Sequence, residues 1–480
     1  MTLRKKALKG VFWSGIEQFA NQLIGFVISI FLARLLMPEE FGLIAMLAIF
    51  IGLGGALIDS GLTQSIIRTV DPDDQDYSTV FYFNLAGSII IYTVVALCAP
   101  LIASFYEQNE LTPILRVYAL IFVINAFSAI QQTKLTKEMD FKSQMLASTP
   151  SLILGGATGI IMAIQGFGVW SLVWSYLVQS LTYTIQLWFW SDWRPIWFFS
   201  KEKFKHHFFF GFKLTLTGII DTIYIHAYPI IIGKFFAPAQ VGYYSKADGL
   251  KQLPVNVFSG IIGKITYPLF SEIQNDDIRM KQVYKKIMQM VIFLVAPTLI
   301  FAAVLAEPIF RFLYTEKWLP AVPYFQILCA AGILYPIHYY NLQILNVKGR
   351  SDLFLKVEII KKIILTVTLI VSFQYGIYGL LYGSVFFSLI AFGINTHFSG
   401  KFINYTALQQ TKDLLPTILL ALLVGFIVYQ LDYFYTELDW NDILRILFGG
   451  LTGLILYIGT SYIFRLNAML ELRRIILRLD

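Results

Sequence analysis

Apolar residues recur along the chain in long runs that few polar positions interrupt. Each run has about 20 residues, the length that a helix needs to cross a bilayer. Packed helices of a soluble protein would instead show a polar face every third or fourth residue. The pattern therefore predicts fourteen membrane-spanning helices. We place six at 10–36, 41–67, 78–105, 113–135, 144–165 and 168–191, six at 208–235, 242–272, 287–306, 321–345, 353–373 and 376–398, and two at 414–431 and 443–464.

One short stretch occurs twice in this pattern. The first copy reads FLARLLMPEEFGL and the second reads IIGKFFAPAQVGY, so Pro38 corresponds to Pro238 and Gly42 to Gly242. Proline cannot continue a helix, because it lacks an N–H and its ring clashes with the preceding turn. Each copy therefore predicts a helix end, a tight turn and a helix start. The register continues further, since GVWSL in the first half matches GIYGL in the second.

This duplication sets the predicted domain organisation. We expect an N-terminal lobe over 1–200, a C-terminal lobe over 201–405, and two additional helices with a tail over 406–480. Because each repeat has an even number of helices, both repeats enter the membrane in the same direction. The predicted fold is an all-α integral membrane protein with two six-helix direct repeats. Such internal symmetry is typical of transporters whose halves rock about a central site.

Positive charges support the helix count. Most of the 37 Lys and Arg residues fall at the N-terminus, in alternate loops and in the C-terminal tail. By the positive-inside rule, these segments and both termini lie in the cytoplasm. The net charge of +7 thus follows from topology, and no nucleic-acid partner is needed to explain it.

Composition and motifs narrow the function class. The chain is 57% hydrophobic and 14% charged, as expected of a polytopic membrane protein. The sequence GxxxxGK[ST] is absent, so an ATP-driven pump is excluded. Cys98 and Cys329 fall inside apolar runs, and the 5 histidines show no metal-ligand spacing. We expect no catalytic residue, no metal and no cofactor, and hence a protein that is not an enzyme.

Ionisable residues inside the spans are the strongest candidates for a site. A charge at the centre of a membrane helix costs about 2.5–3.5 kcal/mol, so such groups face a partner or a wet cavity. Most of them lie on the first two helices of each repeat, which predicts a shared polar cavity. Its lysines would attract an anionic diphosphate or acidic sugar, and its carboxylates would bind a coupling cation. The candidates are Lys213, Lys246, Lys251 and Lys264 for the substrate, and Glu17, Asp59, Asp221 and Asp248 for the ion.

A structural interpretation of these charges stays open. Lys213 and Asp59 lie near the predicted cytoplasmic boundary, where long side chains can reach the headgroups. Asp248 and Lys251 are three residues apart and could pair along one helix face. Asp221 and Lys264 lie deeper, and Asp221 matches the polar Asn21 of the first repeat, so a functional role is favoured for these two residues.

Several stretches resemble the Wzx-type polysaccharide flippases. They are APAQVGYYSKADGLKQLP from Ala237, MPEEFGLIAM in the first half and LIDSGLTQSIIR from Leu57. These flippases share a superfamily, MOP, with the MATE multidrug extruders and the lipid II flippase, and the resemblance covers the whole chain. It implies transfer of an undecaprenyl-diphosphate-linked oligosaccharide from the cytoplasmic to the periplasmic leaflet of a bacterial inner membrane, for O-antigen, capsule or exopolysaccharide synthesis.

The resemblance also implies a mechanism and partners. Transport would proceed by alternating access coupled to a proton or sodium gradient. Membrane lipid surrounds the protein, and a polysaccharide polymerase and a chain-length regulator are further candidate partners. A multidrug extruder of the same superfamily is the main alternative, although cationic drugs favour a carboxylate-lined cavity over one with several lysines. A membrane glycosyltransferase or polymerase would need a large outer loop or an acidic catalytic cluster, and the sequence shows neither.

Overall fold

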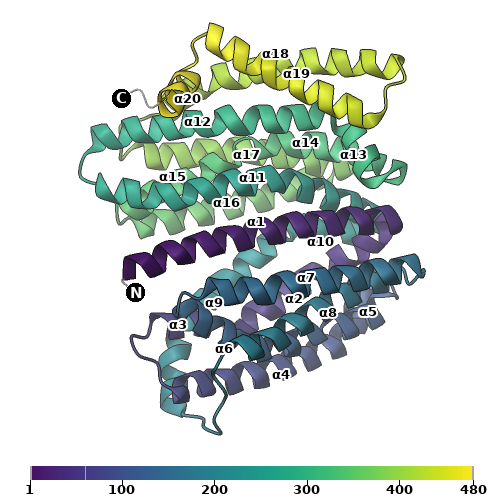
Figure 1. The fold of residues 1–480 in the computed structure, drawn as a ribbon, viewed down its shortest axis with the longest axis vertical. Helices are drawn as coiled ribbons and strands as arrows, with labels where there is room; N and C mark the ends of the chain where they lie inside the picture. The colour runs from purple at the N-terminus through teal and green to yellow at the C-terminus, as the bar shows by residue number, and fades with distance from the viewer. Residues whose placement is uncertain (1–2, 60, 478–480) are drawn as a thin grey trace. The chain divides into compact units, whose positions relative to one another are not determined.

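The computed structural model describes residues 3–59 and 61–477, with the side chains of 3–9, 11, 59, 261–265, 267, 339 and 475–477 outside that description. Over the described residues the regular structure is helical, without strands (Figure 1). Eleven helices in this part of the chain are long and apolar enough to cross a membrane. The chain is therefore a multi-pass, all-α membrane protein, as the sequence predicts.

Three of the expected spans form helices that are too polar to join this set of eleven. Helix α8 (Val169–Trp190) is rich in Ser, Thr and Gln. Helices α11 (Pro238–Glu272) and α16 (Ser351–Phe373) each carry several lysines and carboxylates. A membrane helix bears such groups only where neighbouring protein or a wet cavity receives them. The count of fourteen spans thus stays a prediction.

Two compact units divide the chain after Gly242. Unit 1 extends beyond the predicted lobe boundary at 200, because α9 packs against α2, α3 and α4. Its helices are α1 (Leu3–Leu35), α2 (Pro38–Asp59), α3 (Leu62–Arg68), α4 (Asp74–Tyr106), α5 (Leu111–Tyr118), α6 (Leu120–Lys137), α7 (Phe141–Ile164), α8, α9 (Lys201–Ile225) and α10 (Ala227–Phe235).

Unit 2 is built around α12, which packs against α14 and α18. The C-terminal hairpin of α18 and α19 belongs to this unit, and Tyr457 Oη on α19 donates a hydrogen bond to the carbonyl of Phe293 on α12 at 3.1 Å. The helices of unit 2 are α11, which begins at the end of unit 1, α12 (Asp277–Val304), α13 (Ala306–Tyr314), the 3₁₀ helix η1 (Glu316–Ala321), α14 (Val322–Gly332), α15 (Tyr335–Val347), α16, α17 (Gly376–Gly400), α18 (Ala407–Glu437), α19 (Asp442–Ile463) and α20 (Asn467–Leu477).

The two repeated turns pack against each other. Helix α2 begins at Pro38 and α11 begins at Pro238. A Cβ added at Gly42 would lie 1.9 Å from the carbonyl oxygen of Pro238, and one at Gly242 would lie 2.0 Å from that of Pro38. Only glycine leaves room for this reciprocal approach of the two first turns.

Unit 1 contains a second close approach, between α7 and α8. A Cβ at Gly155 would lie 2.6 Å from the carbonyl oxygen of Ser175, and one at Gly159 would lie 2.9 Å from the Ser175 Cβ. Small residues four apart on a membrane helix allow such packing, because they bring the two backbones together. Helix α1 lies along the same helix α7.

The expected span over 208–235 is interrupted. Helix α9 ends at Ile225 and α10 begins at Ala227, with His226 between them. Pro229 explains the break, because proline has no N–H to donate to the carbonyl of Ile225, four residues earlier. Helix α1, which the sequence predicts to be the counterpart of this span, runs unbroken over 33 residues.

Candidate functional site

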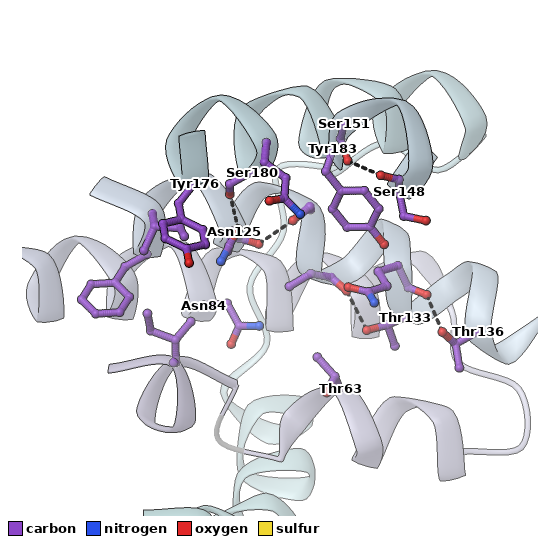
Figure 2. Close-up of a pocket in the computed structure, with 18 of the residues that line it drawn as sticks. Thr63, Asn84, Asn125, Thr133, Thr136, Ser148, Ser151, Tyr176, Ser180 and Tyr183 are labelled. Carbon is purple, nitrogen blue, oxygen red and sulfur yellow. Dashed lines mark hydrogen bonds between the residues drawn. The ribbon is translucent and has the colours of Figure 1, made fainter. Parts of the chain in front are cut away.

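A cavity of about 850 Å³ lies inside unit 1 (Figure 2). Side chains from α1, α2, α3, α4, α6, α7 and α8 line it. Its volume falls within the range of roughly 300–1,000 Å³ that small-molecule sites occupy. The cavity is thus large enough for part of a polar substrate, and the helices that enclose it come from a membrane bundle.

The wall of this cavity is polar but uncharged. None of the described lining residues is Asp, Glu, Lys or Arg. Amide and hydroxyl groups supply the polarity, and each of them can both donate and accept hydrogen bonds. The amides are those of Asn21, Asn84, Asn125, Gln132 and Gln179, and the hydroxyls are those of Thr63, Ser128, Thr133, Thr136, Ser148, Ser151, Tyr176, Ser180 and Tyr183.

One part of the wall is a hydrogen-bond network between α1 and α7. Asn21 Nδ2 donates to Ser148 Oγ at 3.0 Å, and Thr149 Oγ1 donates to Asn21 Oδ1 at 3.1 Å. Ser148 Oγ in turn donates to Glu17 Oε1 at 2.9 Å. Both ends of the Asn21 amide are therefore satisfied within the protein, and the Glu17 carboxylate lies one hydrogen bond behind the cavity wall.

Asn84 on α4 is in the opposite situation. Its side chain is 1% exposed, yet neither Oδ1 nor Nδ2 has a hydrogen-bond partner among the described residues. Figure 2 shows its amide at the cavity, apart from the bonded pair of Ser180 and Asn125. An unsatisfied buried polar group costs about 1–3 kcal/mol, so Asn84 is available to a molecule that enters.

The predicted cationic residues fall in both units. Lys213 is exposed on α9 in unit 1. Lys246 on α11 is buried in unit 2, with Nζ 5.4 Å from the ring centroid of Tyr314 and 5.8 Å from that of Trp318. These rings provide a cation–π environment for the ammonium group.

The other predicted charges have the following places. Lys251 is buried on α11 and pairs with Asp248 at 2.5 Å, and Asp221 is exposed on α9. Asp59 and Lys264 have side chains outside the described part of the chain. Within unit 2 the structure brings Lys246, Asp248 and Lys251 onto one helix, whereas Lys213 and Asp221 lie on α9 in unit 1 and outside the wall of its cavity.

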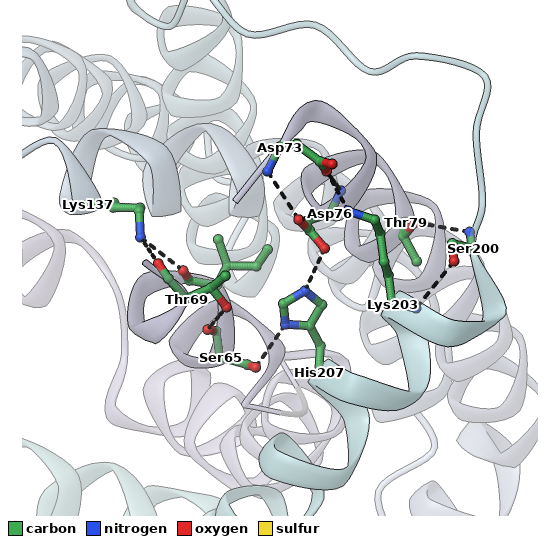
Figure 3. Close-up of polar contacts among 10 residues, drawn as sticks. Ser65, Thr69, Asp73, Asp76, Thr79, Lys137, Ser200, Lys203 and His207 are labelled. Carbon is green, nitrogen blue, oxygen red and sulfur yellow. Dashed lines mark hydrogen bonds and ion pairs between the residues drawn. The ribbon is translucent and has the colours of Figure 1, made fainter. Parts of the chain in front are cut away.

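A second polar cluster joins the start of α9 to α3 and α4 (Figure 3). Lys203 Nζ lies 2.7 Å from Asp73 Oδ1 and 3.0 Å from Asp76 Oδ2. Its hydrogen bond holds the pKa of the Asp73 carboxyl at about 2, below the ordinary value. Asp76 also contacts His207 Nε2 at 3.3 Å, and His207 Nδ1 lies 2.8 Å from Ser65 Oγ. These contacts hold the start of α9 against α3 and the start of α4.

This order of Ser65, His207 and Asp76 looks like a hydrolase triad but is closed to substrate. Ser65 is 4% exposed and His207 is fully buried, so no reacting carbonyl can reach the hydroxyl. Within the described residues, no group of three or more His, Cys, Asp or Glu side chains is placed to hold a metal ion. The neutral cavity therefore remains the main candidate site.

Most residues of this cavity cannot be found by looking for charges in the sequence, because the described lining is uncharged. The amides and hydroxyls that line the wall lie on helices spread over the first 190 residues, and none of them is unusual in its own helix. Asn84 carried a weak signal, as an amide within the apolar run of α4. The sequence singles out Asn21 only as the counterpart of Asp221.

Comparisons with known proteins agree with this architecture. The family described as "Polysaccharide biosynthesis protein" matches residues 31–323. The lipopolysaccharide biosynthesis protein WzxC of Escherichia coli (strain K12) is 24% identical, covering 78% of this chain and 76% of its own. The succinoglycan biosynthesis transport protein ExoT of Rhizobium meliloti (strain 1021) is 25% identical, covering 69% and 67%.

A solved structure shares the fold. The lipid II flippase MurJ, in an inward closed conformation, superposes with a TM-score of 0.77 at 15% identity, covering 95% of this chain and 99% of that one. At this identity the likeness concerns the fold alone. The family match extends over more than half of the sequence, and the chain belongs to the polysaccharide biosynthesis protein family.

Proposed function

We propose that this protein transfers an undecaprenyl-diphosphate-linked oligosaccharide from the cytoplasmic to the periplasmic leaflet of a bacterial inner membrane. The product would feed synthesis of a surface polysaccharide such as O-antigen, capsule or exopolysaccharide. The observation that carries the proposal is a polar, uncharged cavity inside a bundle of membrane helices, in a chain of the polysaccharide biosynthesis family. A MurJ-like fold supports the same proposal.

The chemistry of the substrate requires such a cavity. An oligosaccharide cannot cross hydrocarbon unaided, because each unsatisfied polar group costs several kcal/mol there. Its polyprenyl tail can stay in lipid throughout. A transporter therefore needs a polar path for the sugars and a cationic site for the diphosphate. The candidate cations for the diphosphate are Lys213 in unit 1 and, each taken separately, Lys246, Lys251 and Lys264 in unit 2.

We further propose alternating access coupled to a proton or sodium gradient. The coupling candidates are the carboxylates of Glu17, Asp59, Asp221 and Asp248. Glu17 is supported by its contact with Ser148 on the cavity wall. Each elementary charge that moves through 100 mV supplies about 2.3 kcal/mol. The described cavity wall lacks a carboxylate that would attract a cationic drug, which argues against the multidrug extruder.

The test is a leaflet assay in cells that lack the protein. Lipid-linked oligosaccharide in their membranes is scored with a sugar-oxidising reagent that cannot cross the bilayer. We expect the completed unit to accumulate on the protected cytoplasmic face, with loss of surface polymer. Normal surface polymer together with altered resistance to cationic drugs would overturn the flippase proposal in favour of an extruder.

A substitution separates the role of Lys246 from a general effect of charge. Lys246→Gln should lower surface polymer several-fold in the complemented strain at equal expression, because the variant loses the cation that the rings of Tyr314 and Trp318 enclose. Lys356→Gln is the matched control, since Lys356 is an exposed lysine of α16. Equal polymer levels in both variants would remove Lys246 from the substrate site.

A further inference from the structure

We infer that the cavity of unit 1 binds the uncharged sugar part of the lipid-linked substrate, apart from its diphosphate, with the Asn84 amide hydrogen-bonded to neighbouring sugar hydroxyls. The inference rests on the transport function proposed above. It assigns the neutral cavity of unit 1 to the sugar part of the substrate.

The state of the Asn84 side chain points to a ligand with hydroxyl groups. An asparagine amide offers an acceptor oxygen and two N–H donors, and neither end has a partner in the described part of the chain. A sugar hydroxyl both donates and accepts, so two adjacent hydroxyls can satisfy the oxygen and the nitrogen together. A phosphate oxygen only accepts, and it would leave Asn84 Oδ1 without a donor. Asn84 therefore matches a sugar better than the diphosphate.

The charge of the wall points in the same direction. Its described residues supply no cation, and the carboxylate of Glu17 lies behind Ser148, 2.9 Å from the serine oxygen. An acidic sugar would lose its hydration here without gaining a counter-charge, which is unfavourable for a buried anion. A neutral hexose or N-acetylhexosamine meets no such penalty.

The remaining wall residues suit the same ligand. Tyr176 and Tyr183 line the cavity from α8, and each presents an apolar ring with a polar hydroxyl at its tip (Figure 2). A sugar ring has apolar C–H faces and a polar rim, so one tyrosine can contact both. Asn21 has both amide ends occupied by Ser148 and Thr149, so Asn84 is the buried amide of the wall that lacks a hydrogen-bond partner among the described residues.

Binding of defined probes to the purified full-length protein tests the inference. The probes are geranyl diphosphate without a sugar, the same lipid carrying glucose, galactose or N-acetylglucosamine, and the same lipid carrying glucuronic acid. Isothermal titration in detergent gives each Kd. We expect at least one neutral-sugar probe to bind about tenfold or more tightly than geranyl diphosphate, since one satisfied buried amide has this magnitude. The glucuronic acid probe should gain no such advantage.

Variants then assign the preference to the cavity. Asn84→Leu should abolish the advantage of the neutral sugar and keep the affinity for geranyl diphosphate. Its unfolding temperature should not fall, because an apolar side chain replaces an unpaired buried amide. Asn84→Ala provides the same test if leucine does not fit. Gln131→Leu is the matched control, because Gln131 is a buried amide with both ends unpaired that does not line the cavity, and it should keep the preference.

The outcomes separate this inference from the transport function. The inference is overturned if no neutral sugar improves binding, if Asn84→Leu retains the preference, or if glucuronic acid gains the same advantage. The leaflet assay is scored independently of these titrations. If the leaflet assay shows accumulation but no probe shows a sugar preference, only the sugar site is refuted. If cells lacking the protein make normal surface polymer, the transport function itself is refuted.

Discussion

The reciprocal contact of the repeated turns can be tested by adding one methyl group. In Gly42→Ala the new Cβ would lie 1.9 Å from the carbonyl oxygen of Pro238, although real Cβ contacts essentially never fall below 3.0 Å. The two turns would have to separate by about 1 Å, because a backbone oxygen cannot rotate away. Overpacking of this kind costs about 1–3 kcal/mol, and alanine returns up to about 1 kcal/mol of helix propensity. We expect a net loss of about 1–2 kcal/mol.

Thermal unfolding of the purified full-length protein in detergent measures this loss. At about 2–4 °C per kcal/mol, Gly42→Ala should lower the unfolding temperature by roughly 2–8 °C. Gly242→Ala should act similarly, and the double variant should lose less than the two single losses combined, because the first methyl already opens the contact. Gly249→Ala on α11 is the control, since its Cβ would meet nothing within 4 Å. Unfolding of Gly42→Ala at the temperature of Gly249→Ala would refute the packing argument.

Two ion pairs give further predictions. Arg445 donates from Nε and Nη2 to the two carboxylate oxygens of buried Asp432 at 2.9 and 2.8 Å. Asp432→Ala should cost about 3 kcal/mol, at the lower end for a broken buried pair, because Arg445 keeps a contact with Asp442 at 3.5 Å. Replacing both partners by leucine should cost less, and equal unfolding temperatures for the single and double variants would contradict this. Lys203 holds the pKa of Asp73 at about 2, so the stabilisation is present above the unfolded pKa of about 3.9 and is lost as the pH falls toward 2. In Lys203→Met the unfolding temperature should depend less on pH over that interval. The same pH dependence as in the unmodified protein would show that Lys203 does not lower the pKa of Asp73.

The sequence predicts the helices better than the site. Apolar runs locate helices reliably because a bilayer leaves the backbone few alternatives. The runs do not show where a helix breaks, since the interruption at His226 depends on one proline within an apolar stretch. They also do not show which side chains converge. Asn84 and Tyr183 are 99 positions apart and meet at one cavity only because α4, α6 and α8 pack together.

Intramembrane charges carried less information than expected for a related reason. The insertion cost of a charge shows that it has a partner or water, but not which one. Lys251 finds its partner on its own helix in Asp248, and Lys246 finds aromatic rings. The neutral amides give a weaker signal than charges do, since Asn84 stands in the sequence only as one amide within the apolar run of α4.

The interruption between α9 and α10 has a consequence for how stiff this part of the chain is. Helix α1 is a single helix of 33 residues, whereas its predicted counterpart in the second repeat is interrupted at His226. An unbroken helix tilts as one unit, whereas the two parts of an interrupted helix can tilt independently. The first helix of the two predicted repeats therefore differs in stiffness, although the sequence motifs of the two repeats match.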